Sequence, residues 1–209
     1  MVSVGGIMIK LKETDFGNVI TEHKKWIDSL GRQGTRLSID EIDFSETNIS
    51  EKLFEQAYIT GCSFDNINAK DISFYLAKLC ASSFRNSNLE NVDFTKADLS
   101  YVEFSNSKLY DINFNKCECI ETNFAKAELT NVKMTDVLLD TVDLRDTKIS
   151  NIDVSNSSLE AVLVKGMSLK NVIGLDKLIR VSINIGDVDK TIMLYGEDAI
   201  QWLESNSEQ

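Results

Sequence analysis

Few side chains in this sequence could carry out chemistry. The 209 residues contain one histidine, His23, and four cysteines, of which Cys117 and Cys119 have the close spacing of a metal-binding or redox pair. The sequence has no glycine-rich phosphate loop, no nucleophile elbow and no HExxH pattern. Asp and Glu are abundant, but a carboxylate needs a surrounding pocket before its pKa moves toward catalysis. We therefore expect a protein that is not an enzyme and that binds no cofactor or metal.

A repeat of five residues decides where these side chains lie. All 27 positions spaced five apart from Ile39 to Leu169 are apolar, although Ala69 is small. A period of five differs from the 3.6 of a helix and the 2 of a strand, so it indicates short strand steps separated by corners and stacked as a solenoid. The leading members of the series are Phe44, Ile49, Phe54, Ile59, Phe64, Phe74, Leu79, Phe84, Leu89, Phe94, Leu99, Phe104 and Leu109.

A second class of small or β-branched residues lies two positions before these apolar centres. Residues two apart on a strand face the same side, so both classes are expected to point into the solenoid. Cys62 and Cys117 belong to this second class and Cys119 is a centre, so filling of the core is the simpler explanation of the close cysteine pair. Cys80 is expected to face outward. Lys52 falls at an inward position, which predicts an irregular or open first coil.

The chain must turn two positions after each centre. Of the 27 residues at these positions, 14 are Asn, Asp or Gly, which tolerate turn and left-handed backbone geometry. Proline is absent from the sequence, consistent with a solenoid in which nearly every backbone N–H pairs with a neighbouring coil. The centres become smaller after residue 134 while their partner positions grow, so we expect the interior volume to stay roughly constant.

The repeat resembles that of the pentapeptide-repeat family, which is written roughly A(D/N)LxX. The likeness rests on steps such as TKADL at 95–99, NSNLE at 86–90, NVDFT at 91–95 and AELTN at 127–131, and it covers about two-thirds of the chain. The resemblance implies an all-β solenoid, a right-handed quadrilateral parallel β-helix with four pentapeptides in each coil. About seven coils, at roughly 4.8 Å each, would make a rod about 33 Å long.

Both flanks of the rod are expected to cap its ends, because unpaired β edges invite aggregation. Residues 1–38 are assigned to the N-terminal cap, residues 39–173 to the β-helix and residues 174–209 to the C-terminal cap. In the first cap, apolar residues at helical spacing predict an amphipathic helix that ends near Gly31, and the opening residues 1–12 could add a strand. This spacing includes Phe16, Val19, Ile20, His23, Ile27 and Leu30, so we expect a structural role for His23.

The C-terminal cap is expected to contain a hairpin and a helix. Two alternating apolar runs, residues 178–185 and 191–195, follow the last repeat and predict a β-hairpin. Residues 197–204 predict a short terminal helix. This segment would cover the end of the rod, and it could in addition pair with a second copy to make a homodimer.

Composition and charge narrow the range of partners. The chain has a net charge of −11, and residues 39–173 hold 22 Asp or Glu against 13 Lys or Arg. An acidic rod repels the phosphate backbone, so we expect no direct binding of nucleic acid. The sequence has no run of 18 apolar residues and no signal-peptide pattern, so we expect a protein that does not cross a membrane and that stays in the cytoplasm.

Two modes of protein binding remain open. The first uses outward apolar side chains that the repeat does not require and that would form a patch on one side of the rod. Such a module could act as a scaffold, an inhibitor or an immunity-type binder, and scatter without function is the competing explanation of the same residues. The candidate patch consists of Tyr58, Tyr75, Leu76, Cys80, Tyr101, Ile120 and Leu138.

The resemblance implies the alternative, a mimic of duplex DNA like the quinolone-resistance (Qnr-like) proteins that bind DNA gyrase and topoisomerase IV. B-DNA of about 33 Å carries roughly 19 phosphates at one charge per ~1.7 Å, whereas residues 39–173 have a net charge of −9. The charge density is thus about half that of DNA, and the unbroken register leaves no room for the inserted loops of several Qnr-like proteins. The carboxylates that would mimic phosphates are Asp93, Asp98, Glu103, Asp111 and Asp143.

Overall fold

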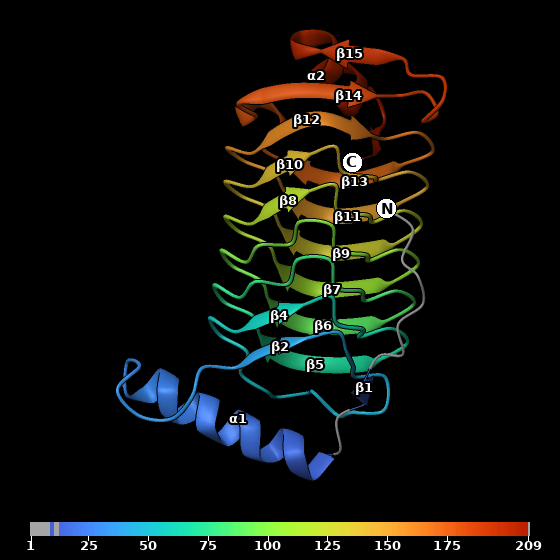
Figure 1. The fold of residues 1–209 in the computed structure, drawn as a ribbon. Helices are drawn as coiled ribbons and strands as arrows, with labels where there is room; N and C mark the ends of the chain where they lie inside the picture. Colours follow the sequence, from blue (N-terminus) through green and yellow to red (C-terminus); the bar gives the residue numbers. More distant parts are fainter. Residues whose placement is uncertain (1–8, 11–12, 209) are drawn as a thin grey trace.

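The chain folds into a parallel β-solenoid with a helix at each end (Figure 1). The structure is a computed structural model that describes residues 9–10 and 13–208. It confirms the expected right-handed quadrilateral β-helix of about seven coils, with an N-terminal helix and with a C-terminal hairpin followed by a short helix.

Most strands are short, because each covers only one or two sides of a coil. The N-terminal cap and the first coils contain β1 (Ile9–Lys10), α1 (Glu13–Asp28), β2 (Ser38–Asp40), β3 (Ile42–Asp43), β4 (Tyr58–Thr60) and β5 (Asn68–Ser73). The middle coils contain β6 (Asn88–Asp93), β7 (Lys108–Asn113), β8 (Glu118–Ile120), β9 (Glu128–Lys133), β10 (Leu138–Asp140) and β11 (Lys148–Asp153). The last coils and the C-terminal cap contain β12 (Ser158–Leu163), β13 (Ser168–Ile173), the 3-10 helix η1 (Leu175–Lys177), β14 (Arg180–Asn184), β15 (Met193–Tyr195), α2 (Gly196–Ser205) and β16 (Ser207–Glu208).

Neighbouring coils are 20 residues apart. Asn88 of β6 pairs with Lys108 of β7, which pairs in turn with Glu128 of β9. One sheet has the strand order β16-β13-β11-β9-β7-β6-β5, and another has the order β15-β14-β12-β10-β8. The spacing changes at the C-terminal cap, where Ser158 of β12 pairs with Arg180 of β14. Within the rod, a residue and its counterpart 20 positions later therefore lie one above the other.

Phenylalanine rings fill most of the core. They form two facing ladders, at residues 44, 64, 84, 104 and 124 and at residues 54, 74, 94 and 114, and all are fully buried. Rings within a ladder are stacked, as for Phe64 and Phe84, whose centroids are 4.6 Å apart. Rings of the two ladders meet edge to face, as for Phe84 and Phe94 at 6.0 Å. Both arrangements are favourable for aromatic pairs, so the ladders hold successive coils in register.

With the exception of Glu46, the corners from Glu41 to Asn171 adopt the left-handed backbone that their positions predicted. Non-glycine residues there have φ between 51° and 63°, and they include Lys96 and Tyr101 as well as Asn and Asp. Hydrogen bonds between coils hold this conformation, so a corner does not need Asn, Asp or Gly. Where Asn recurs, its side chains form a ladder of their own, in which Asn151 donates to Asn131 and Asn171 donates to Asn151, each at 2.8 Å.

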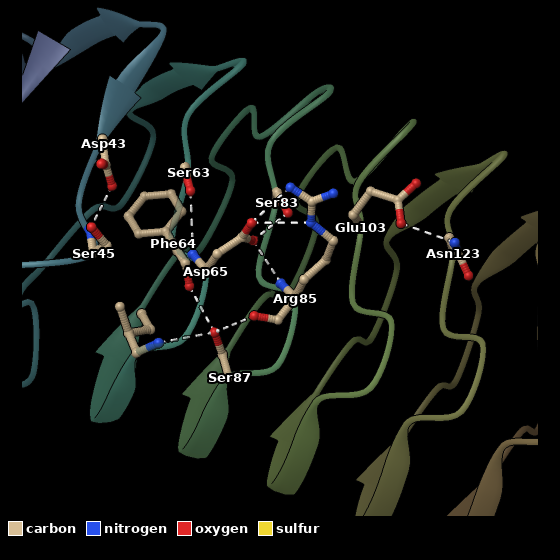
Figure 2. A network of polar contacts seen from close by, with 11 residues as sticks. Asp43, Ser45, Ser63, Phe64, Asp65, Ser83, Arg85, Ser87, Glu103 and Asn123 are labelled. Atoms are coloured by element: carbon tan, nitrogen blue, oxygen red, sulfur yellow. Dashed lines mark hydrogen bonds and ion pairs between the residues drawn. The ribbon is translucent and has the colours of Figure 1, made fainter. Parts of the chain in front are cut away.

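Inward hydroxyl groups join one coil to the next. Ser87 donates to the carbonyl of Phe64 at 2.7 Å and accepts from the backbone N–H of Ile67 at 3.2 Å (Figure 2). Ser82 and Ser157 each make the same pair of contacts with the coil before them. Among the described residues, no buried side-chain nitrogen or oxygen lacks a hydrogen-bond partner. The small inward residues of the repeat therefore also provide hydrogen-bond partners for backbone groups at the corners.

Helix α1 lies across the N-terminal end of the rod (Figure 1) and buries Phe16 and His23. The ring of Phe16 meets that of Phe44 with centroids 5.4 Å apart. The predicted apolar stripe is wrong at two positions, because Val19 is 36% exposed and Leu30 is 86% exposed. The helix ends at Asp28, and helical spacing therefore does not apply to Leu30.

The opening strand and the first coil agree in part with their predictions. β1 pairs in parallel with β3, while residues 1–8 and 11–12 of the same predicted segment lie outside the described residues. Lys52 is half-buried, and the stretch between β3 and β4 has only an isolated bridge between Leu53 and Ser73. The first coil is therefore less regular than the others, as Lys52 predicted.

The C-terminal segment covers the other end of the rod. β14 and β15 pair antiparallel with Ile183 opposite Leu194, which confirms the hairpin. α2 buries Ala199 and Leu203 against the end of the core, and β16 pairs with β13. These elements occupy the edges of both long sheets at this end, so the segment acts as a cap.

The interior is less well filled toward this cap. An apolar cavity of about 40 Å³ lies where the phenylalanine ladders end, and Phe124, Met134 and Leu144 contribute to its lining. The ladder of Phe124 continues with Leu144, and the facing ladder continues with Met134. The larger partner residues therefore do not fill this part of the rod completely.

Candidate protein-binding surface

The rod has four sides, and most of the predicted patch lies on one of them. We name this side the β10 face and define it by the outward residues 58, 60, 78, 80, 98, 100, 118, 120, 138, 140, 158 and 160. Four candidate residues lie on it, namely Tyr58, Cys80, Ile120 and Leu138. Tyr101 and Leu76 occupy the two corners that flank the face, with φ of 63° and 57°, and Tyr75 lies just beyond Leu76.

Ile120, Leu138 and Tyr101 form a compact apolar cluster, which we name the upper cluster. The register of β8 and β10 places Glu118 opposite Leu138 and Ile120 opposite Asp140, so Ile120 and Leu138 are diagonal neighbours. The backbone N–H of Tyr101 donates to the carbonyl of Ile120 at 2.8 Å, and the Tyr101 residue is 53% exposed. Ile120 and Leu138 are half-buried, so Tyr101 is the most accessible member of the upper cluster.

Tyr58 lies at the N-terminal end of the face and is covered by cations. The guanidinium carbon of Arg36 is 3.8 Å from the centroid of the Tyr58 ring, and the Nζ atom of Lys78 is 5.6 Å from it. Both distances are in the range of cation–π contacts. Nε of Arg36 also donates to the carbonyl of Gln56 at 2.6 Å, which fixes the guanidinium over the ring. Tyr58 is thus separated from the upper cluster and already has contacts within the chain.

The cysteine thiols are protonated at neutral pH. Cys62, Cys117 and Cys119 are buried, and burial raises the pKa of Cys62 to about 11 and that of Cys119 to about 12. Cys80 is half-buried and not fully outward; burial and a hydrogen bond with Asp98 raise its pKa to about 11. A protonated thiol is a weak nucleophile and a weak metal ligand.

The five carboxylates of the DNA-mimic hypothesis do not lie together. Asp98 is on the β10 face, Glu103 and Asp143 are on the next side, Asp93 is on the same side as Tyr75, and Asp111 is at a corner of the opposite side. Several of them have partners within the chain. Nδ2 of Asn123 donates to Glu103 at 2.9 Å (Figure 2), and Nη2 of Arg145 lies 2.6 Å from Asp143. Together these five do not form a single stripe along the rod.

Opposite sides of the rod differ in charge. The 12 outward positions of the β10 face include four carboxylates and one lysine. The opposite face, half a coil away, has four lysines and two glutamates at the outward residues 68, 70, 88, 90, 108, 110, 128, 130, 148, 150, 168 and 170. The acidity of the chain is therefore unevenly distributed, and the β10 face combines it with the upper cluster.

A second group of exposed apolar side chains lies at the C-terminal cap, outside the predicted patch. β15 is at the edge of its sheet, and Tyr195 at its end is 64% exposed. The other members are 48% to 68% exposed, and they are Ile173, Ile179, Val188 and Ile192. The sequence shows the alternation of apolar and polar residues in the hairpin. It does not show which of these side chains are covered by the last coil, because that depends on the change of register at β14.

The described residues contain no group of three or more His, Cys, Asp or Glu that could hold a metal ion. Within the same residues, no helix has the length and apolarity needed to cross a membrane.

Comparison with known proteins identifies the repeat. A family model described as a pentapeptide repeat region matches residues 37–114, and a model of eight pentapeptide repeat copies matches residues 104–146. Together they span more than half of the chain. No curated protein sequence matches it at a significant level.

Solved structures with a similar fold are distant in sequence. The pentapeptide repeat protein Rfr23 from the cyanobacterium Cyanothece 51142 is 18% identical, with 56% of this chain and 83% of Rfr23 covered and a TM-score of 0.40. A structure of QnrB1, a plasmid-mediated fluoroquinolone resistance protein, is 15% identical, with 69% and 86% covered and a TM-score of 0.40. HetL, involved in heterocyst differentiation regulation in the cyanobacterium Nostoc sp. strain PCC 7120, is 14% identical, with 71% and 79% covered and a TM-score of 0.28. These likenesses carry no argument about function, but the repeat models and the 20-residue coil agree: the chain belongs to the pentapeptide-repeat family.

Proposed function

We propose that this chain is a non-enzymatic protein-binding module that holds its partner on the β10 face. The observation that carries the proposal is the upper cluster, in which Ile120 and Leu138 lie on the acidic β10 face beside the 53% exposed Tyr101 at its corner. Pentapeptide repeat proteins are typically protein-interaction modules, which agrees with this use. An apolar centre with a charged rim is the usual composition of a protein interface.

The chemistry of the face indicates the kind of partner. Asp98, Glu118 and Asp140 surround the upper cluster, so a complementary surface would present Lys or Arg around an apolar centre. Lysines predominate on the opposite face, which makes that face unsuitable for the same partner. A scaffold, an inhibitor and an immunity-type binder would all use such a contact.

The alternative is a DNA mimic that binds DNA gyrase or topoisomerase IV, as the Qnr-like resemblance implies. It is supported by the excess of carboxylates in the repeats. It is weakened by the distribution of its candidate carboxylates over several sides of the rod and by their partners within the chain, such as Arg145 beside Asp143. We therefore rank it second.

The two functions differ in their response to salt and to mutation. Tagged protein would be used to capture partners from a lysate of the host at low and at high salt. Binding through the upper cluster predicts capture that survives high salt and that Leu138→Asp or Tyr101→Ala abolishes. Tyr110→Ala is the matched control, because Tyr110 is 46% exposed on the opposite face.

Mimicry predicts a different result in the same experiment. Capture of a topoisomerase would require low salt, and it would fall when Asp93, Asp98, Glu103, Asp111 and Asp143 are changed to their amides. Supercoiling by purified gyrase would then be inhibited by the unmodified chain and not by the amide variant. Capture that survives high salt and is insensitive to the amide changes would rule out mimicry as the main function.

A homodimer through the C-terminal cap is a second association that we propose. It is supported by the exposed Ile179, Ile192 and Tyr195 around the free edge of β15. Analytical ultracentrifugation should show a concentration-dependent dimer that Tyr195→Asp shifts to monomer. A monomer at all concentrations would contradict this association without affecting the β10 face.

A further inference from the structure

The only histidine of the chain is locked between the N-terminal helix and the rod. His23 lies on α1 and has no exposed surface. The backbone N–H of Leu37 donates to its Nδ1 at 3.0 Å, and its Nε2 lies 3.0 Å from the carbonyl oxygen of Glu55. Because Nδ1 accepts from an amide, the single proton of the ring is on Nε2, which donates to the Glu55 carbonyl. The neutral tautomer is therefore fixed by two backbone partners outside α1.

We propose that His23 is a pH-dependent latch whose protonation releases α1 from the end of the rod while the coils remain folded. A second proton would be placed on Nδ1, directly against the N–H of Leu37. A hydrogen bond would become a contact between two donors, in a site without access to water. The imidazolium can be solvated only if α1 moves away from Leu37 and Glu55.

The charged groups around the ring favour its neutral form on balance. Burial lowers the pKa of His23, and the nearby Arg36 guanidinium lowers it further. The hydrogen bond to the Glu55 carbonyl and the Glu55 carboxylate act in the opposite direction, but they do not reverse the shift. That carboxylate also accepts a hydrogen bond from Ser73 at 3.0 Å. On its own helix, His23 has the Trp26 ring stacked beside it with centroids 6.0 Å apart.

The position of α1 explains why it would open before the rod. Each central coil is paired with a coil above and a coil below, whereas α1 packs on one end. Its main apolar contact is Phe16, whose ring lies 5.4 Å from Phe44 and 6.1 Å from Phe54. Release of the helix would therefore uncover the first rings of both phenylalanine ladders, an apolar surface on which a second copy could stack.

Hydrogen exchange of the whole chain tests the latch. If a proton binds His23 only when α1 is undocked, the opening constant of residues 13–28 should rise about 30-fold between pH 7.5 and 5.0, after correction for intrinsic exchange. Exchange in β6, β7 and β9 should keep its corrected rate. The His23→Asn variant keeps an acceptor for Leu37 but does not titrate, so its α1 should show no such pH dependence.

The nuclear magnetic resonance signals of the His23 ring measure its protonation independently and without a variant. Since the chain has one histidine, its imidazole signals are unambiguous. The latch predicts an Nε2-protonated neutral ring at pH 6.0 and loss of α1 protection as the ring becomes charged. A ring that titrates at about pH 6.5 with α1 still protected would overturn the proposal. Equal pH dependence of α1 in His23→Asn, or uniform opening of α1 and the rod, would overturn it as well.

Discussion

The change of Gly174 to alanine should destabilise the chain far more than the same change at Gly61. Both glycines have left-handed backbone, with φ of +86° and +60°. At Gly174, an added Cβ would lie 2.7 Å from the backbone nitrogen of Ser155 and 2.8 Å from its Cα. At Gly61 the nearest atom would be Oδ1 of Asp40 at 3.4 Å, an ordinary contact. The pair therefore separates the cost of the backbone conformation from the cost of the steric overlap.

The magnitude can be worked out from these contacts. An alanine in left-handed backbone lowers the free energy of unfolding by about 1–2 kcal/mol. Alanine also has less conformational freedom than glycine in the unfolded chain, which offsets about 0.4–1 kcal/mol of this cost. Ala81 and Ala161 already occupy the same corner as Gly61 in other coils, with φ of 59° and 53°. Gly61→Ala should therefore cost within about 1 kcal/mol. Gly174→Ala adds an overlap with backbone that cannot move freely, worth about 1–3 kcal/mol more.

Urea unfolding, followed by circular dichroism and by fluorescence of the two tryptophans, would measure the difference. We expect a total cost of about 1–4 kcal/mol for Gly174→Ala, with an unchanged slope against urea if the transition remains cooperative. Trp202 lies in α2, so its signal reports on the C-terminal cap that follows Gly174. Equal midpoints for the two variants would show that the overlap at Gly174 has no cost in stability.

Four further predictions concern the core, the cavity, the thiols and acid stability. Phe104→Ala should lower the free energy of unfolding by about 3–5 kcal/mol, measured by urea unfolding, because it interrupts a stacked ladder. Leu144→Phe should fill the cavity of about 40 Å³ and raise the free energy of unfolding by about 1 kcal/mol, seen as a higher melting temperature. Burial raises the pKa of Cys62 and Cys119 to about 11 and about 12, so a thiol reagent at pH 8 should label them at least about 100-fold faster in urea than in the folded chain. Because the pKa of His23 is lowered in the folded chain, the unfolded chain binds the His23 proton more tightly, so the free energy of unfolding should be highest above pH 6.5 and fall below it. Urea unfolding at a series of pH values would measure this fall, which should be smaller in His23→Asn.

The five-residue period predicts a solenoid, and the likeness to the pentapeptide-repeat family implies four repeats in each coil. Together they predict that Phe64 and Phe84 lie one above the other, as their stacked rings do. The corners were predicted by position rather than by residue type. Lys96 and Tyr101 have left-handed backbone although neither is a typical corner residue, because the hydrogen bonds between coils impose it.

The candidate surface could be predicted only in part, because it also depends on residues outside the repeat. The period placed Ile120 and Leu138 on one side, and the register makes them neighbours. The cation that covers Tyr58 comes from Arg36, which precedes the repeats and has no periodic position. The exposed group around Tyr195 follows a change of register at β14, which the alternation of the hairpin does not reveal.

Footprinting of the chain with its partner would show which side of the rod is the binding surface. A complex captured from the host lysate would be exposed to hydroxyl radicals, and the oxidation of each side chain would be compared with that of the free chain. Binding through the upper cluster predicts protection of Tyr101, Ile120 and Leu138 and no protection of Tyr110 on the opposite face. Protection at Tyr110 or at the C-terminal cap, with the upper cluster oxidised as in the free chain, would contradict it.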